Sequence, residues 1–302
     1  MRTRPPDWTD APAVLALLVA RHTADIGLPL VRLQEVQDEW HAPDLELARD
    51  VLLVEIDDEL AGYAIVHRPG AFAVVSPTHE GRGVGTLLLR WTQQRGRERG
   101  VALHRHTAAS TNARARELFE NAGYHQARSY WRMARPLDRG VTPVGPPTGV
   151  TLRPLDADAD ARAVHALDDE TFAARPDYVP ESYEGFVQDH LGSHDVAPEL
   201  SLVAEESGEI VGFMLARRWE HEVSGYVDVL GVAPGHQRRG IGTALLTQGF
   251  AAFAAAGLVQ AQLDVASDNP EGLRVYEAAG MGARFRFDIF ERPVDHPDAN
   301  ST

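Results

Sequence analysis

A glycine-punctuated turn occurs twice in this 302-residue chain, and the repeat constrains the fold more than any other feature of the sequence. One copy contains Gly83 and the other Gly240, 157 positions further on. The same separation still relates Pro136 to Pro293, without a gap in between. A register kept over so long a stretch predicts two homologous domains in tandem rather than a solenoid or one large domain.

The length supports this division, since a chain of this size is expected to form two domains of roughly 150 residues. We predict an N-terminal domain at residues 1–139, a linker rich in proline and glycine at 140–149, and a C-terminal domain at 150–302. Near the start of each half the separation between matching residues is only 149. The second copy is therefore expected to hold extra residues in its strand hairpin, around Trp219–Tyr226.

Hydrophobic periodicity gives both halves the same order of elements. Each half begins with a strand and an amphipathic helix, continues with a strand hairpin, and reaches a central strand that leads into the glycine turn and a helix. In the second half a further strand, a helix at 271–279 and a last strand at 285–291 are expected to complete that domain. Strands with helices on both faces predict an α/β fold with a mixed sheet.

Composition excludes several classes of function. The chain has no cysteine, which rules out thiol catalysis and disulfides, and the strand pair His104 and His106 lacks further ligands, so we expect no metal site. A net charge of −15 argues against nucleic-acid binding and suits either a cationic amine substrate or simple solubility. Without a signal peptide or an apolar span, we expect a cytoplasmic protein with no membrane partner; a homodimer stays open.

The turn after the second central strand is a candidate anion site. A glycine turn that opens a helix directs several backbone N–H groups at one point, beside the positive end of the helix dipole, and a phosphate is the natural ligand there. Gly240 and Gly242 have no Cβ, so a ligand can approach the backbone closely. The candidate cofactor-binding residues are Leu230, Val232, Gln237, Arg238, Arg239, Gly240, Ile241, Gly242, Thr243 and Asn269.

The run from Gln237 to Gly242 resembles the acetyl-CoA signature of the GNAT N-acetyltransferase superfamily. The resemblance implies two tandem GNAT domains, each with a mostly antiparallel sheet whose two central strands splay apart. It also implies acetyl-CoA as co-substrate, no metal, and transfer of the acetyl group to a primary amine of a small molecule by direct attack.

Two further residues match positions of that superfamily. Asp228 stands on the central strand, where it is expected to share a face with Tyr226 and Leu230 and to take the ammonium proton, directly or through a water. Its alternative role is local pairing. Tyr276 resembles the tyrosine that protonates the departing thiolate, and its alternative role is a core aromatic. Asn269 is a helix cap, a CoA contact, or both.

The first half lacks this chemistry, because the residues that match Asp228, Gln237 and Tyr276 are Ala71, Glu80 and Phe119. We therefore expect the N-terminal domain to be catalytically degenerate. A silent first copy beside a competent second one is similar to the arrangement of mycothiol synthases, which would carry a Glu at the position of Tyr226. The alternative acceptors are those of mycothiol synthases and aminoglycoside or peptide amines. The alternative function is a non-catalytic CoA-binding regulatory module.

Overall fold

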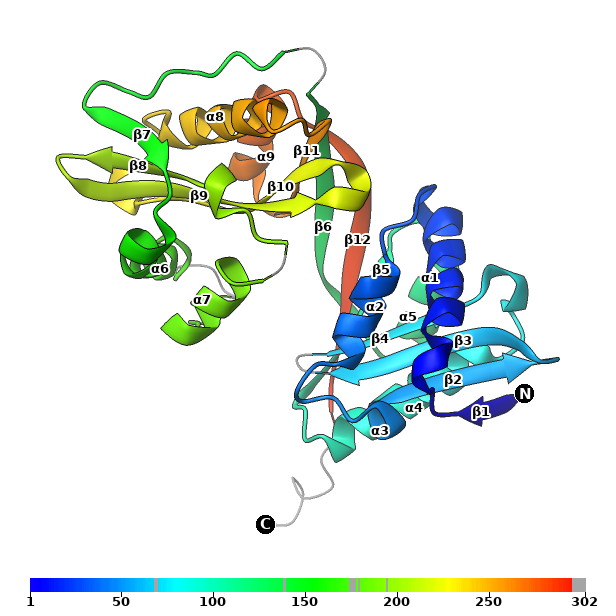
Figure 1. Ribbon diagram of the computed structural model, residues 1–302. Coiled ribbons are helices and arrows are strands. Elements are labelled where there is room, and N and C mark those ends of the chain that lie inside the picture. Colours follow the sequence, from blue (N-terminus) through cyan, green and yellow to red (C-terminus); the bar gives the residue numbers. More distant parts are fainter. Residues whose placement is uncertain (68–69, 138–139, 174–177, 179, 194, 295–302) are drawn as a thin grey trace, which may run out of the picture. The chain divides into compact units, whose positions relative to one another are not determined.

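The computed structural model describes residues 1–67, 70–137, 140–173, 178, 180–193 and 195–294, and shows a mixed α/β protein (Figure 1). The chain folds into two compact units. Unit 1 consists of residues 1–130 and 285–302, and unit 2 consists of residues 131–284. Each unit has strands in its middle and helices on both faces, which agrees with the α/β class expected from the sequence.

Unit 1 contains an antiparallel four-stranded sheet in the order β1-β2-β3-β4 and a separate pair formed by β5 and part of β12. Helices α1 and α2 cover one face of the four-stranded sheet, and α4 packs on the other. The elements are β1 (Arg2–Arg4), α1 (Ala11–Ile26), α2 (Leu33–Trp40), α3 (Leu47–Asp50), β2 (Val51–Ile56), β3 (Glu59–His67), β4 (Gly70–Val75), α4 (Val84–Glu98), β5 (Leu103–Ala109), α5 (Ala113–Asn121), β6 (His125–Pro136) and β12 (Gly282–Pro293).

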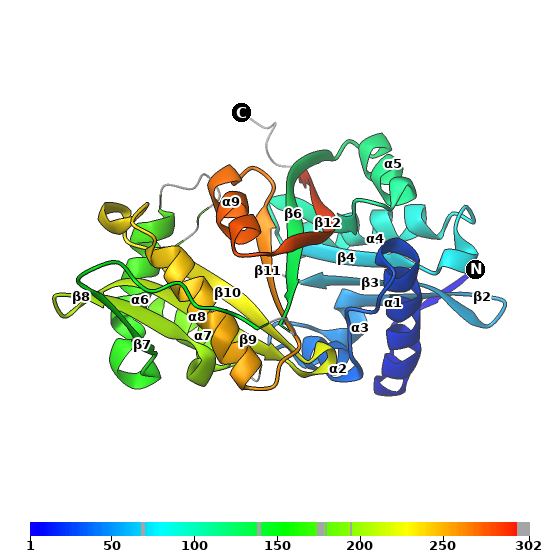
Figure 2. The ribbon, with the colours of Figure 1, turned by 90° about the horizontal axis from the view of Figure 1, so that it is seen from above.

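Unit 2 has the strand order β7-β8-β9-β10-β11-β6. Its larger core lies between the sheet and α8, and a second core lies under α6 and α7 on the opposite face (Figures 1 and 2). The elements are β7 (Val150–Pro154), α6 (Ala157–Phe172), α7 (Tyr183–His190), β8 (Leu202–Glu206), β9 (Glu209–Trp219), β10 (Ser224–Val232), α8 (Ile241–Ala255), β11 (Gln260–Ala266) and α9 (Pro270–Ala278).

The last strand of each sequence half extends into the unit built mainly from the other half: residues 131–136 of β6 belong to unit 2, and residues 285–293 of β12 belong to unit 1. In β12, residues Phe287–Pro293 pair antiparallel with Leu103–Ala109 of β5, so this strand does not complete the second half as expected. In return, Met133 of β6 lies in the main core of unit 2. The physical reason is the repeat itself: two homologous end strands have equivalent patterns, and nothing local tells each strand which sheet to join.

The hairpin of unit 2 is longer than its counterpart in unit 1, where we expected the extra residues. Strands β9 and β10 have 11 and 9 residues, against 9 and 6 in β3 and β4, and the 3-10 turn Glu220–Glu222 joins them. The stretch 140–147 has no regular structure, although it is not free of contacts. The Val144 N–H donates to Thr247 Oγ1 on α8 at 3.0 Å, and Val141 packs on the main core.

Across the described ranges, no helix has the length and apolar character needed to cross a membrane.

Candidate active site

The glycine turn of unit 2 leaves the first turn of α8 open. Gly240 is the N-cap of the helix with φ +91°, and no side chain caps the helix. The N–H groups of the first turn of a helix have no intrahelical acceptor, and they lie at the positive end of its dipole. A Cβ built on Gly240 would meet no atom within 4 Å, so the approach to these groups is clear. The backbone therefore fits an anionic ligand such as a diphosphate.

The side chains of the turn differ in how many hydrogen bonds and ion pairs they form. Gln237 donates through Nε2 to the Val232 carbonyl at 3.1 Å, and Arg239 forms two bonds to the Glu206 carboxylate at 2.6 and 3.0 Å. Arg238 is exposed, has φ +60°, and makes no ion pair within the described part of the chain. Ile241 is 1% exposed in the main core, so only its backbone can serve a ligand.

The central strands separate next to this turn. Strand β10 pairs in parallel with β11 only from Ser224 to Tyr226, although β10 continues to Val232. On its other side β10 stays paired with β9, where Leu230 lies opposite Met214. The second half of β10 therefore has backbone groups that face the gap rather than a neighbouring strand. This is the splay that the GNAT resemblance implies.

A β-bulge in β10 changes the predicted alternation of side chains. The pairing with β9 shifts register between Val227 and Val229, which leaves Asp228 as the extra residue. Val227 and Leu230 pack on the α8 side, whereas Val229 packs on the side of α6 and α7. Asp228 also lies on that second side, since it contacts α7. The expectation that Leu230 shares a face with Asp228 is wrong, because a bulge inverts the alternation downstream.

Asp228 is bound by a histidine and an arginine. Its Oδ2 is 2.7 Å from Nδ1 of His190, the last residue of α7. Arg217 of β9 grips the same carboxylate with Nε 2.9 Å from Oδ1 and Nη2 3.0 Å from Oδ2. Burial raises the pKa of Asp228, but the hydrogen bonds from His190 and Arg217 outweigh it and leave the pKa below its usual value. The Asp228 carboxylate is therefore ionised, and its oxygens already accept hydrogen bonds from His190 and Arg217.

More acidic groups surround His190. The Glu181 Oε2 lies 3.7 Å from His190 Nε2, and burial raises the pKa of Glu181. Burial also raises the pKa of Asp168 on α6 to about 6, and the neighbouring His190 opposes the shift. Tyr178 donates a hydrogen bond to Asp169. Asp168 and Asp169 of α6 therefore belong to this acidic cluster.

The α9 side of unit 2 carries the other predicted residues. Tyr276 is half-buried on α9 and packs at the edge of the main core. Asn269 is the N-cap of α9, because its Oδ1 accepts from the Gly272 N–H at 2.9 Å. Thr243 is in the first turn of α8 and its carbonyl accepts from Thr247 Oγ1. Both predicted roles therefore stay open for each residue. Tyr276 is a site residue or a core aromatic, and Asn269 is a CoA contact, a helix cap or both.

Sequence reasoning missed His190 and Arg217. Neither belongs to a motif, and His190 is a single histidine at the end of a short helix. Two aromatic residues of α7 have different surroundings: Phe186 is fully buried core, whereas Tyr183 packs against His165 and under the Arg162 guanidinium. The available signal was the density of acidic residues and histidines between residues 165 and 190.

The matching turn of unit 1 has the same backbone but is bridged by ion pairs. Gly83 is the N-cap of α4 with φ +83°, and its Cβ would also meet no atom within 4 Å. Glu80, which replaces Gln237, lies 2.5 Å from Arg21 of α1 and 3.2 Å from Arg114 of α5. The Glu80 carboxylate thus links α1, the turn and α5, and the two arginines neutralise its charge.

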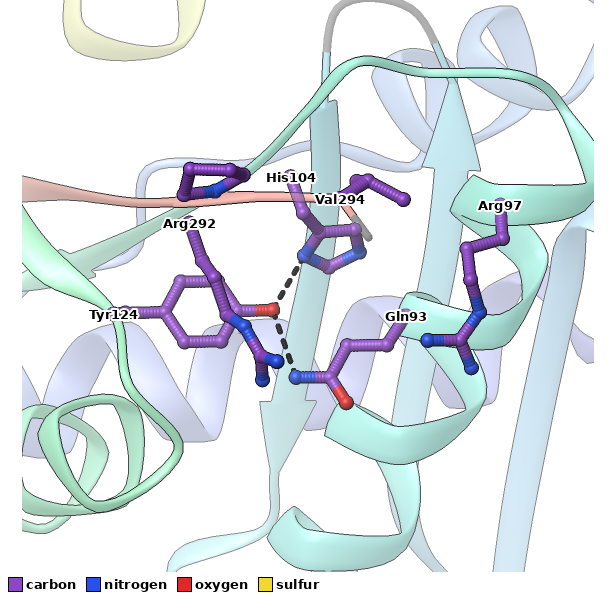
Figure 3. Close-up of a pocket in the computed structure, with 7 residues that line it drawn as sticks. Gln93, Arg97, His104, Tyr124, Arg292 and Val294 are labelled. Carbon is purple, nitrogen blue, oxygen red and sulfur yellow. Dashed lines mark hydrogen bonds between the residues drawn. The ribbon is translucent and has the colours of Figure 1, made fainter. Parts of the chain in front are cut away.

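Unit 1 also has a small, partly open pocket lined by Gln93, His104 and Tyr124 (Figure 3). In it Tyr124 Oη is 2.6 Å from His104 Nδ1, and Gln93 donates to the same hydroxyl. His106 is buried behind them, 3.2 Å from Thr92 Oγ1, and burial lowers its pKa to about 3. These groups largely bind one another. Among the residues that the structure describes, no three His, Asp or Glu side chains gather in a way that would hold a metal.

Comparison with known proteins agrees with the geometry of the turns. The profile of a family described as "Acetyltransferase (GNAT) family" matches residues 18–124 and 162–281. The chain belongs to the GNAT acetyltransferase family. Mycothiol acetyltransferase from Streptomyces avermitilis is 34% identical to this GNAT protein over 90% of the chain and 88% of its own length. The mycothiol acetyltransferase from Thermobispora bispora is 32% identical over 94% and 96%. The chain is thus an acyltransferase.

Solved structures extend the likeness over both units. A GCN5-related N-acetyltransferase from Sphaerobacter thermophilus has a TM-score of 0.85 and 29% identity, covering 98% of this GNAT chain and 96% of its own. A tandem GNAT protein from the clavulanic acid biosynthesis pathway has a TM-score of 0.75 at 16% identity, with 98% and 99% covered. The second likeness shows the fold alone, and it shows that fold to be the tandem one.

Proposed function

We propose that unit 2 transfers the acetyl group of acetyl-CoA to a primary amine of a small molecule. The observation that carries the proposal is the open turn at Gly240, beside a strand that has separated from its neighbour. The uncapped N–H groups of α8 and the exposed Arg238 would hold the diphosphate of the donor. The free edge of β10 would bind the amide-bearing arm of CoA through backbone hydrogen bonds.

The acceptor would come from the side of α6 and α7. The carboxylates of Asp168, Glu181 and Asp228 make this side negative, which attracts an ammonium group. The amine must lose a proton before it can attack. Its nitrogen then forms the C–N bond with the thioester carbonyl, the C–S bond breaks, and Tyr276 gives a proton to the leaving thiolate.

The acceptor is proposed at the level of its class. Because two relatives are mycothiol acetyltransferases, the amine of a mycothiol precursor is the first acceptor to test. Aminoglycoside and peptide amines form the comparison set. A CoA-binding protein without turnover is the rival function, and it would bind acetyl-CoA yet acetylate none of these amines.

The decisive experiment is calorimetric titration of acetyl-CoA into the wild type and into two matched variants, Gly240→Trp and Gly83→Trp. Both glycines have positive φ and open space around them, so the two substitutions place similar strain on the backbone. We expect one binding site in the wild type, lost in Gly240→Trp and kept in Gly83→Trp.

The amine panel is then assayed by release of CoA thiol and by mass spectrometry of the acetylated product. Loss of binding in Gly83→Trp alone would move the site to unit 1. Two sites in the wild type would show that unit 1 also binds the donor, although Glu80 replaces Gln237 in its turn.

A further inference from the structure

We propose that His190 takes the proton from the acceptor amine and that Asp228 is the positioning residue that holds its imidazole. This inference deepens the proposed function and rests on it. The family resemblance points to the carboxylate of the central strand as the base. In this chain the imidazole of His190 contacts that carboxylate and is the more exposed of the two groups.

Asp228 is poorly suited to receive a proton in this arrangement. Both of its oxygens accept bonds from Arg217, and Oδ2 also faces His190 Nδ1. Arg217 is fixed in turn, because it binds the Asp189 carbonyl at 2.6 Å and Asp195 Oδ1 at 2.8 Å. Protonation of Asp228 would cost the attraction of the Arg217 guanidinium and the hydrogen bond from His190, and the lowered pKa of Asp228 expresses that cost.

His190 has the opposite properties. Its side chain is 23% exposed, against 15% for Asp228, so it is the more accessible member of the pair. With a proton on Nδ1 donated to Asp228, the neutral ring has its lone pair on Nε2, which can accept a proton and lies 3.7 Å from Glu181 Oε2. The ring packs against Phe186, with 5.0 Å between centroids, and this contact with the core fixes its plane.

The surroundings also stabilise the product of proton uptake. Burial lowers the pKa of His190, but the hydrogen bond and charge of Asp228 and the charge of Glu181 outweigh it, so the pKa lies above 6.5. His190 also ends α7, where the helix dipole favours a cation. The charged and titratable groups packed around it are His165, Asp168 and Asp169 of α6, Glu181, Asp189 of α7, Arg217 of β9 and Asp228 of β10.

The proton step is balanced. The ammonium of the acceptor gives one proton to His190 Nε2, the imidazole becomes an imidazolium paired with Asp228, and the neutral amine attacks the thioester. The attacking nitrogen loses a second proton when the tetrahedral intermediate collapses to the amide, and this proton replaces the one that Tyr276 gives to the leaving thiolate. The imidazolium returns its proton to solvent after the product leaves. Only the neutral ring can act, so the rate is expected to rise with pH through a pKa above 6.5.

The test is the pH dependence of kcat/KM in the full-length protein, with any amine that the wild type acetylates. In His190→Gln the side-chain amide can still donate to Asp228, but it cannot take the proton. We expect kcat to fall by about 10²–10³-fold. The rise of kcat/KM with pH that follows deprotonation of His190 should also disappear. In Asp228→Asn the rise of kcat/KM with pH should remain but shift to lower pH, because the group that raises the imidazole pKa has lost its charge.

His165→Gln is the matched control. His165 also packs on the Phe186 ring, but its Nε2 faces the Glu181 carbonyl and not Asp228. This variant should keep the rise of kcat/KM with pH. Added imidazole should partly restore the rate of a His190→Ala variant, an effect that a purely structural role would not produce.

The outcomes separate the two proposals. Full activity in His190→Gln, together with an inactive Asp228→Asn, would return the base to Asp228 and overturn this inference alone. A wild type that acetylates no amine would overturn the proposed function and this inference with it. Nitrogen-15 NMR of the wild-type histidines gives a readout without turnover: a His190 that titrates below 6.5 contradicts the inference.

Discussion

Single residues distinguish the two copies of the repeat. Their backbones are alike at Gly83 and Gly240, yet one turn presents Glu80 held by two arginines and the other presents Gln237 folded back on its own strand. The substitution itself was visible in the sequence. The arginines that neutralise Glu80 were not, because they come from helices distant in the chain.

Tyr276 offers the simplest chemical test at this scale. Tyr276→Phe removes one hydroxyl and keeps the ring that packs at the edge of the main core. We expect kcat to fall about 10²-fold while the Kd of acetyl-CoA stays nearly unchanged, because under the proposed function the variant loses only the donation of a proton to the leaving thiolate. Tyr130→Phe in unit 1 is the control and should be silent. An equal loss in donor affinity would show that Tyr276 has a binding or structural role.

At the scale of elements, prediction worked where the signal is local and was wrong where it is not. The glycine turn, the helix that follows it and the cap at Asn269 depend on neighbouring residues, and the structure has each of them. The bulge at Asp228 left no mark in the alternation of residues. The partners of β6 and β12 depend on a choice between two equivalent sheets, which no local pattern encodes.

The exchange of these strands predicts crossed effects on stability. Phe290 of β12 is 1% exposed and packs with Phe119 in unit 1, whereas Met133 of β6 is 1% exposed in the core of unit 2. Phe290→Ala should destabilise unit 1 by about 3–5 kcal/mol, and Met133→Ala should destabilise unit 2 by about 2–5 kcal/mol. Hydrogen exchange resolved by peptide measures both. Protection lost first in β9 for Phe290→Ala would contradict the pairing.

The whole molecule is therefore not the sum of its two sequence halves. The division at 139 and 150 follows the repeat, while the compact units exchange their last strands. A fragment of residues 1–139 leaves β5 without the partner that β12 gives it, and an unpaired edge strand of this kind promotes aggregation.

We expect the fragment 1–139 to lack a cooperative unfolding transition. Joining residues 285–294 to residue 130 through a flexible linker should restore one, because the β5–β12 pair and Phe290 are then present. Thermal unfolding followed by circular dichroism distinguishes the two fragments. A cooperative transition in the bare fragment would mean that β6 can take the place of β12 beside β5, as the repeat allows.

The exchange has a consequence for how such a gene can change. After a duplication, a domain copy that lacks catalytic residues can normally be deleted without loss of function. Here each copy holds a strand that the other needs, so deleting either one also damages the survivor. Positions such as Ala71 and Phe119, which match Asp228 and Tyr276 of the second copy, can therefore change while the scaffold of the first copy is retained. The strand exchange makes the duplication hard to reverse, and selection on the second copy alone is enough to preserve the first.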